Sequence, residues 1–211
     1  MTSTVQIRGL TRHDLTRVAE VHVQAFRDSA ITKLGKEATR RYYEWQLTGP
    51  HDCQAIGAFI DGALAGFCFG GVFRGAMSGF LHANRLFLIG RVLARPYLLA
   101  DPLFRSRFFH GLHVLRRFRW SKTPTRQTRK KTPDAFGILS IAVDPRWQGR
   151  GIGRALMEAA EAEAERRGFE SMRLTVSPKN GQATRFYERL GWGKVNGGGA
   201  WQGRRKKTLH A

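Results

Sequence analysis

The stretch from Leu139 to Leu156 limits the possible folds of this chain more than any other. An apolar run typical of a buried strand breaks at Asp144-Pro145, crosses a loop with glycines at positions 149, 151 and 153, and enters an amphipathic helix. This order brings several unpaired backbone N–H groups and the positive end of a helix dipole to one point. Such a point binds phosphate or pyrophosphate. The sequence therefore predicts a strand–turn–helix unit with an anion-binding turn.

Two better-known phosphate loops are excluded at this position. No Gly-Lys-Ser/Thr follows the loop, as a P-loop requires. The glycines are followed by Leu156 and lack the Gly-x-Gly-x-x-Gly order of a dinucleotide fold, and an acid near the end of a second strand is missing. Taken alone, the loop is also compatible with a turn that binds no ligand.

A second motif follows the next predicted strand, Ser171–Ser177. Asn180 and Tyr187 are seven residues apart, which corresponds to two helical turns, so the spacing predicts that both lie on one helix face. Ala183 lies between them and keeps that face open. The alternative is an ordinary buried tyrosine whose hydroxyl has a hydrogen-bond partner.

Together, the two blocks resemble the acetyl-CoA-binding motifs of the GNAT superfamily of N-acetyltransferases. The matching positions are Gln148-x-x-Gly151-x-Gly153 and Asn180-x-x-Ala183-x-x-x-Tyr187-x-x-x-Gly191-Trp192. The resemblance covers residues 1–73 by element order and 136–211 by motif, but not 74–135. It implies an α/β fold, with a mixed central sheet of about six or seven strands flanked by helices in a single domain over 1–211.

The resemblance also implies roles for individual positions. The strand edge at Ile141, Ala142 and Val143 would pair with the pantetheine arm of acetyl-CoA, and Asn180 would hydrogen-bond that arm. Tyr187 would act as the general acid that protonates the leaving thiolate. The rest of the cofactor would be bound mainly through backbone N–H groups at its pyrophosphate. The residues that the resemblance implies in this binding are Gln148, Gly149, Arg150, Gly151, Ile152, Gly153 and Arg154. The implied reaction is direct attack of a primary amine, from an amino sugar or another small amine, on the thioester, without a metal.

The sequence assigns no general base. Some relatives carry Glu five residues before the motif asparagine, where this chain has Thr175. His22, Glu20 and Glu44 are candidates, but a solvated surface role is the better expectation for each. Asp144 is expected to shape the strand exit. A base that acts through water is consistent with this pattern.

The remaining elements follow from periodicity and turn signals. Asp61-Gly62 between two apolar runs predicts a hairpin of Ala55–Ile60 with Ala63–Phe69. We also expect a strand at Val5–Arg8, helices from Thr11 to about Phe26, Gly35 to Leu47, the glycine loop to Arg167 and Asn180 to Leu190, a strand at Ile138–Val143 and a final hairpin at Lys194–His210.

Positive charge is concentrated between the third and fourth predicted strands. The chain of 211 residues has a formal net charge of +20, and residues 74–135 contribute 14 Lys/Arg against two acidic residues. A helix over 80–95, with Asn84, Arg91 and Arg95 on one side, and a polar basic loop over 122–133 are expected there. This basic helical insertion is compatible with a solvated face, an anionic bilayer contact, an RNA-binding platform or a dimer surface. An anionic acceptor would also suit the charge.

Cysteine usage and hydropathy bear on localisation. The chain has two cysteines, Cys53 and Cys68, and neither a disulfide framework nor a zinc spacing can be built from them. Since no signal-peptide core or spanning stretch is seen, we expect a cytoplasmic protein, with peripheral membrane contact as an option. The competing function is an acyl-CoA-fold binding module that acts at an anionic membrane or RNA through the insertion.

Overall fold

A computed structural model describes residues 4–73, 75–101, 104–105, 135–196 and 202–209. The chain divides into two compact units. The sheet unit comprises Met1–Leu10, Asp52–Phe73 and Lys131–Ala211, and the helical unit comprises Thr11–His51 and Arg74–Lys130. A single domain over 1–211 stays a prediction.

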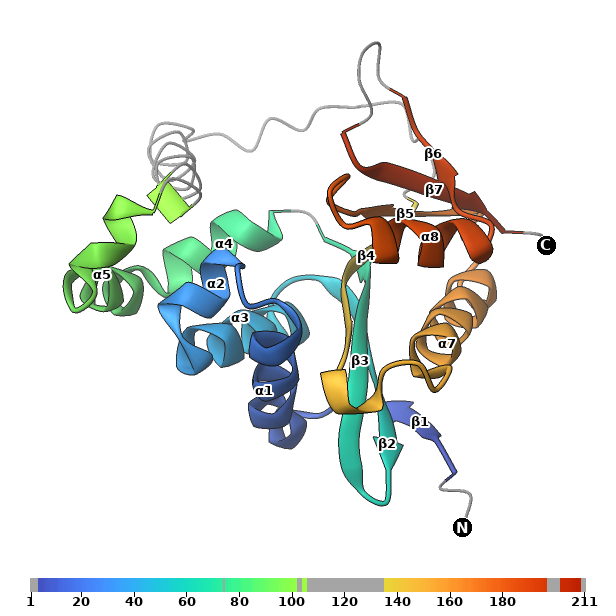
Figure 1. The fold of residues 1–211 in the computed structure, drawn as a ribbon, viewed down its shortest axis with the longest axis horizontal. Helices are drawn as coiled ribbons and strands as arrows, with labels where there is room; N and C mark the ends of the chain where they lie inside the picture. The colour runs from blue at the N-terminus through green and yellow to red at the C-terminus, as the bar shows by residue number, and fades with distance from the viewer. Residues whose placement is uncertain (1–3, 74, 102–103, 106–134, 197–201, 210–211) are drawn as a thin grey trace. The chain divides into compact units, whose positions relative to one another are not determined.

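The sheet unit is built on a mixed sheet with the strand order β1-β2-β3-β4-β5-β7-β6 (Figure 1). Neighbouring strands are antiparallel except β4 and β5, which are parallel. The predicted mixed sheet is thereby confirmed. The strands are β1 (Gln6–Gly9), β2 (Asp52–Ile60), β3 (Ala63–Val72), β4 (Phe136–Val143), β5 (Ser171–Thr175), β6 (Gly193–Lys194) and β7 (Arg204–Thr208).

The predicted hairpin of β2 and β3 is confirmed. Asp61 and Gly62 both have positive φ, 48° and 77°, which is the conformation of a type I′ turn and matches the twist of the flanking strands. Both strands extend beyond the predicted limits, to Asp52 and Val72. Their inner parts are buried at consecutive positions, so they show continuous apolar runs instead of strict alternation.

Helices α7 (Ile152–Arg166) and α8 (Gly181–Arg189) belong to the same unit, with the short η3 (Pro145–Trp147) before α7 (Figure 1). The apolar face of α7 includes Leu156 and Met157, both fully buried, and it shares one core cluster with Met172 and Leu174 of β5 and Tyr187 of α8. Gly168, with φ of 76°, follows the end of α7 as the sequence predicts.

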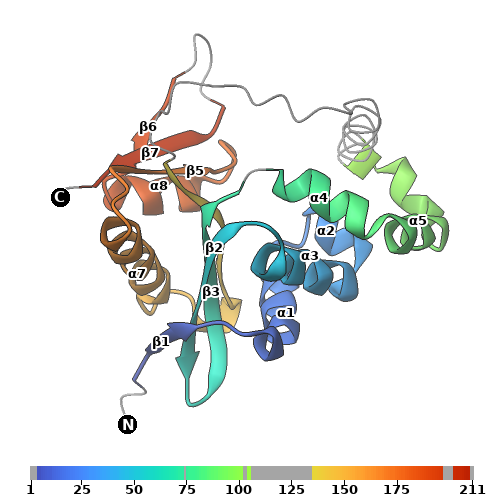
Figure 2. The ribbon, with the colours of Figure 1, turned by 180° about the vertical axis from the view of Figure 1, so that it is seen from behind.

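The helical unit contains α1 (Leu15–Ala25), α2 (Ala30–Leu34), α3 (Lys36–Thr48), α4 (Ala76–Ala83) and α5 (Arg85–Leu93), with the 3₁₀ segments η1 (Arg12–Asp14) and η2 (Pro96–Ala100) (Figure 2). Helices α1 and α3 pack through small and aromatic side chains such as Ala19, Ala38 and Tyr43, all fully buried. The sequence analysis missed α2, because a five-residue helix has no measurable apolar period.

The expectation of one helix over 80–95 is wrong. The helix breaks at Asn84 (φ −110°, ψ 16°), between α4 and α5, and Pro96 begins η2. Arg91 and Arg95 do lie on one side, since Arg91 Nε donates to the Leu34 carbonyl and Arg95 Nη1 donates to that of Lys33, each at 3.0 Å. The predicted basic loop over 122–133 lies outside the described residues.

Candidate functional site

The two parallel strands of the sheet separate along their length. Strands β4 and β5 pair only at Phe136 with Met172 and at Gly137 with Arg173. On its other side β4 stays paired with β3 as far as Val143. Along Ile138–Val143 no described strand therefore pairs with the second edge of β4, which leaves backbone groups for a ligand. The predicted positions Ile141, Ala142 and Val143 lie on this edge.

Asp144 shapes the exit of β4, as the sequence predicts. Its carboxylate accepts hydrogen bonds from the Arg146 backbone N–H at 2.9 Å and from Arg146 Nη2 at 2.7 Å. The hydrogen bonds from Arg146 hold the pKa of this carboxyl below its usual range. Asp144 is thus an ionised turn-forming residue, and the geometry gives it no role as a base.

Glycine is required at 149 and 151 for conformation, whereas position 153 has room for a methyl group. Gly149 and Gly151 both have φ of 79°, a left-handed conformation that L side chains avoid. A Cβ atom added to either would meet no atom within 4 Å, so the backbone there is open to a ligand. At Gly153, an added Cβ would lie 3.4 Å from the Phe186 ring and 3.7 Å from Val143. These are ordinary contact distances, so the packing of α7 does not depend on glycine at 153.

The N-terminus of α7 is uncompensated. Gly151 is its N-cap and supplies no side-chain acceptor, and the first turn contains no acidic residue. The first N–H groups of this 15-residue helix are the ones that an α-helix cannot pair internally. Ile152 is itself 1% exposed, so its side chain belongs to the core and not to the surface of the site.

Two cations flank this helix end. The Arg150 guanidinium lies over the Trp147 ring, 4.8 Å from its centroid. Arg154 is exposed and forms only a loose ion pair with Glu158 at 3.9 Å. Open glycine backbone, an uncompensated helix end and two exposed arginines fit a pyrophosphate-bearing cofactor.

Gln148 joins the end of β4 to the glycine turn. Its Nε2 donates to the backbone carbonyl of Val143 at 3.1 Å. The side chain thereby fixes the loop geometry and occupies one carbonyl of the strand segment that the resemblance assigns to the pantetheine arm. In this arrangement Gln148 positions the turn.

The sequence predicts that the helix begins at Asn180, whereas in the structure α8 begins at Gly181 and Asn180 is the residue before it. It is the N-cap, and its Oδ1 accepts a hydrogen bond from the Ala183 backbone N–H at 3.0 Å. The residue is exposed, and its amide nitrogen donates to no described residue. The asparagine thus caps a helix while keeping a donor for a ligand.

Tyr187 is 8% exposed, and its ring packs against Phe186 at 5.2 Å and Trp192 at 6.1 Å between centroids. Burial raises the pKa of its phenol above the usual value of 10.0, the Cys68 thiol adds to this, and Arg205 opposes it. The hydroxyl therefore keeps its proton at neutral pH. No described residue hydrogen-bonds to it, in contrast to an ordinary buried tyrosine.

His22 is not the solvated surface residue that was expected. It is 6% exposed, with Nδ1 2.7 Å from the Tyr43 hydroxyl and Nε2 3.1 Å from Ser29 Oγ. Burial lowers its pKa to about 4. This neutral imidazole links α1 to α3 and to the N-cap of α2. Sequence reasoning missed the network because Ser29 and Tyr43 are polar residues on elements that only packing brings together.

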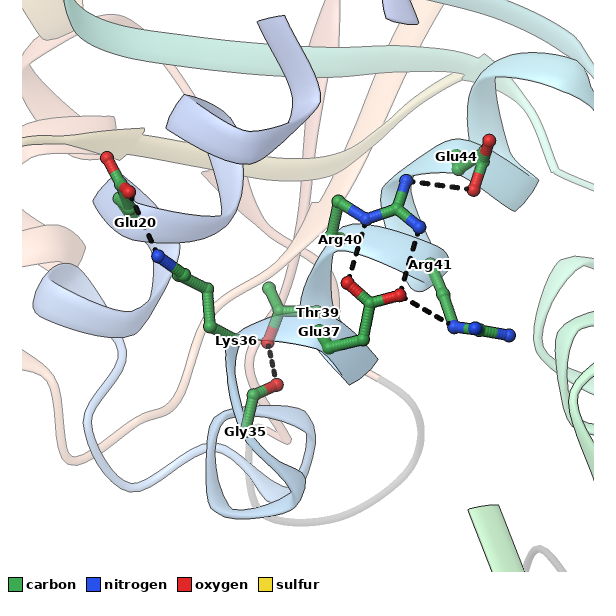
Figure 3. Close-up of polar contacts among 8 residues, drawn as sticks. All are labelled: Glu20, Gly35, Lys36, Glu37, Thr39, Arg40, Arg41 and Glu44. Carbon is green, nitrogen blue, oxygen red and sulfur yellow. Dashed lines mark hydrogen bonds and ion pairs between the residues drawn. The ribbon is translucent and has the colours of Figure 1, made fainter. Parts of the chain in front are cut away.

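Glu20 and Glu44 are engaged in ion pairs within the helical unit (Figure 3). Glu20 accepts from Arg17 at 2.8 Å and from Lys36 at 3.1 Å, and these hydrogen bonds lower its pKa. Glu44 accepts from Arg40 at 3.1 Å, and Arg40 also binds Glu37. Thr175 is exposed on β5. Among the residues that the structure describes, none is therefore assigned as the general base.

Solved structures of acetyltransferases share this fold. PaiA N-acetyltransferase from Thermoplasma acidophilum, crystallised in complex with coenzyme A, superposes with a TM-score of 0.58 at 16% identity, covering 97% of this chain and 99% of that one. At this identity the likeness concerns the fold.

Curated sequences match over shorter stretches. The ribosomal protein bS18–alanine N-acetyltransferase of Escherichia coli is 41% identical over 62 residues, which is 29% of this chain and 42% of that protein. The mycothiol acetyltransferase of Salinispora arenicola is 36% identical over 103 residues, or 48% of this chain and 30% of that protein. The chain thus spans less than half the length of the curated relatives it matches.

The family comparison covers most of the chain. The model described as the acetyltransferase (GNAT) family matches residues 16–192, which include the glycine turn, Asn180 and Tyr187. Both the fold and the motifs agree with this match. The chain belongs to the GNAT family of acetyltransferases.

Proposed function

We propose that this chain transfers an acetyl group from acetyl-CoA to a primary amine by direct attack of the amine on the thioester. One observation carries the proposal: β4 loses its pairing with β5 after Gly137, and its last residue, Val143, lies beside the first turn of α7, whose N-terminus is uncompensated. An extended arm can add to the free strand edge while an anionic group binds at the helix end. The alternative, an acyl-CoA-fold binding module that acts through the insertion, would keep the cofactor site but assigns no role to the Tyr187 hydroxyl.

Each part of the donor has matching residues in this site. The backbone from Gly149 to Arg154 faces the pyrophosphate, with Arg150 and Arg154 adding charge. The edge at Ile141–Val143 serves the pantetheine arm, and the amide nitrogen of Asn180 supplies a donor to it. Bound acetyl-CoA supplies an activated acyl group, and these residues fix its position relative to the amine.

Tyr187 supplies the proton that the departing sulfur requires. As the amine nitrogen forms its bond to the acyl carbon, the C–S bond breaks and the sulfur takes the phenolic proton. Because burial raises the Tyr187 pKa, the phenol is protonated throughout the neutral range. The proton that the amine loses passes to water, and the Tyr187 phenolate regains a proton from water after each turnover. This route agrees with the absence of a base among the groups described at the site.

We further propose that the acceptor amine carries an anionic group. Met172 and Leu174 of β5 face the core shared with α7 and α8, so Arg173 and Thr175 lie on the opposite face, where both are exposed. Arg173 stands directly opposite the exposed Lys206 of β7. Like charges at opposed positions destabilise a strand pair, and no described carboxylate pairs with either side chain. A bound phosphate or carboxylate would relieve this repulsion.

Arg173 also marks the point where the strands part, since it is the last residue of β5 paired with β4. The helices α7 and α8 cover one face of that point, which leaves the face of Arg173 for the acceptor. If Arg173 binds the anionic group of the acceptor, the amine of the same acceptor would lie next to the acyl group.

Turnover with pairs of amines tests the proposal. Release of free thiol from acetyl-CoA, with mass detection of the acetylated product, is measured for amines that differ only by a phosphate or carboxylate. We expect a preference for the anionic member that falls about tenfold in kcat/KM, or about 1.4 kcal/mol, in Arg173→Gln with Lys206→Gln. Arg166→Gln with Arg189→Gln, two exposed changes on α7 and α8, removes the same number of charges elsewhere and serves as the charge-matched control. Turnover of no amine would overturn the transferase proposal, whereas equal rates for both members would overturn only the anionic acceptor.

A further inference from the structure

The helical unit exposes an apolar face along α5 and η2. Leu86 is 77% exposed, Ile89 54%, Leu93 74% and Tyr97 66%. Spacings of three and four residues place Leu86, Ile89 and Leu93 on one side of α5, and Tyr97 continues the series into η2. Single exposed apolar residues are common on protein surfaces, but a row of this kind marks an interaction surface.

Contacts on the other side of α5 hold this apolar face outward. Val92, Leu98 and Phe104 form a buried cluster with Ala30 and Leu34 packed against it. The backbone carbonyls at the end of α2 accept hydrogen bonds from Arg91 and Arg95, and Lys33 pairs with Asp101. The orientation of α5 within the helical unit is therefore fixed by packing and by charge-assisted bonds.

The segment that carries this face has charge of one sign. Residues 75–100 contain three arginines and no acidic residue, and Asp101 is engaged by Lys33. Arg85 is exposed at the start of α5, beside Leu86. A helix that combines exposed leucine and isoleucine with arginine is suited to the interface of an anionic bilayer.

We propose that the α5–η2 face docks on a bilayer containing anionic lipids, with Leu86, Ile89, Leu93 and Tyr97 inserted and Arg85 at the headgroups. A second copy of the chain is a poorer occupant, because a two-fold contact through this face would oppose like charges. No helix in the described part of the chain has the length and hydropathy to cross a bilayer. The inference stands independently of the acetyl-transfer proposal.

Vesicle co-sedimentation of the whole chain tests the docking. The two vesicle types are pure phosphatidylcholine and phosphatidylcholine with phosphatidylglycerol. The test variant combines Leu86→Ser, Ile89→Ser and Leu93→Ser, all at exposed positions where the fold does not depend on the side chain. Met77→Ser, on α4 and 54% exposed, is the control for loss of an exposed apolar side chain outside the α5–η2 face. Circular dichroism checks that each variant is folded, and light scattering after gel filtration measures the oligomeric state.

We expect the wild type and Met77→Ser to sediment with anionic vesicles, at least tenfold more than with neutral ones, and to be released by high salt. The triple variant should lose at least tenfold in partition. Equal partition of the triple variant and the wild type would overturn the proposal. The proposal would also be overturned if the wild type did not bind anionic vesicles, including the case in which it dimerises in solution through the same leucines.

Discussion

The side-chain oxygen of Asn180 accepts a hydrogen bond from the backbone N–H of Ala183 at 3.0 Å, which makes Asn180 the N-cap of α8. One amide group therefore has two separable functions. Its oxygen begins the helix that carries Tyr187, while its nitrogen is the group that we assign to the donor substrate. The two functions respond differently to substitution.

Asn180→Asp should preserve the cap and remove the amide donor. Aspartate caps helices as well as asparagine does, whereas Asn180→Ala should cost about 1 kcal/mol of the free energy of unfolding. We expect both variants to raise KM for acetyl-CoA several-fold, although only the alanine variant is less stable. Urea denaturation and steady-state kinetics measure the two effects. A wild-type KM in Asn180→Asp would remove the nitrogen from the donor site.

Gly151→Ala should affect stability and donor binding together. Its φ of 79° imposes strain of about 1–2 kcal/mol on an alanine, and the added methyl enters the open space above the turn. We expect a lower unfolding free energy and weaker binding of coenzyme A in calorimetry.

Gly153→Ala is the matched control for that substitution. Position 153 is helical, and its added methyl meets Phe186 at an ordinary contact distance of 3.4 Å. The gain in helix propensity offsets the closer packing, so stability should change by less than about 1 kcal/mol. Equal losses of unfolding free energy and of coenzyme A binding in the two variants would show that the left-handed conformation at Gly151 has no special role.

The buried imidazole of His22 should make stability depend on pH. Burial lowers its pKa to about 4 from 6.5, so below pH 6.5 the unfolded chain binds a proton that the folded chain does not. The stabilisation that depends on neutral His22 is fully present above pH 6.5. At pH 5 the free energy of unfolding should be lower by about 2 kcal/mol. Urea denaturation at pH 7.5, 6 and 5 measures the slope.

His22→Gln should flatten this slope, whatever its own stability at pH 7.5. A weaker slope of the same sign should persist, because burial also lowers the pKa of His51. The pH range stops at 5, above the usual titration of the carboxylates. An unchanged slope in His22→Gln would contradict a buried neutral His22.

The sequence predicted the sheet unit well because its signals are local. The Asp61-Gly62 turn, the glycines at 149 and 151 and the stop at Gly168 all specify backbone conformations that few other residues adopt. The order of these signals was enough to place the turn and Tyr187 on a strand–helix framework.

The helical unit was less predictable because its structure depends on contacts distant in sequence. The break at Asn84 follows no turn motif, and Arg91 and Arg95 bind carbonyls of α2, a helix too short to detect. His22 illustrates the same limit: its burial depends on Ser29 and Tyr43, which periodicity alone cannot bring together. The opposed pair of Arg173 and Lys206 required the β5–β7 register.

Tyr187→Phe tests the central claim most directly, because the substitution removes one hydroxyl and leaves a ring of nearly the same shape in the core. That hydroxyl bonds to no described residue, so the unfolding free energy and the dissociation constant of coenzyme A should stay close to the wild-type values. We expect kcat for acetyl transfer to fall by about 10²–10⁴, the range for loss of a general acid. Wild-type kcat in a folded, coenzyme A-binding Tyr187→Phe would contradict the account.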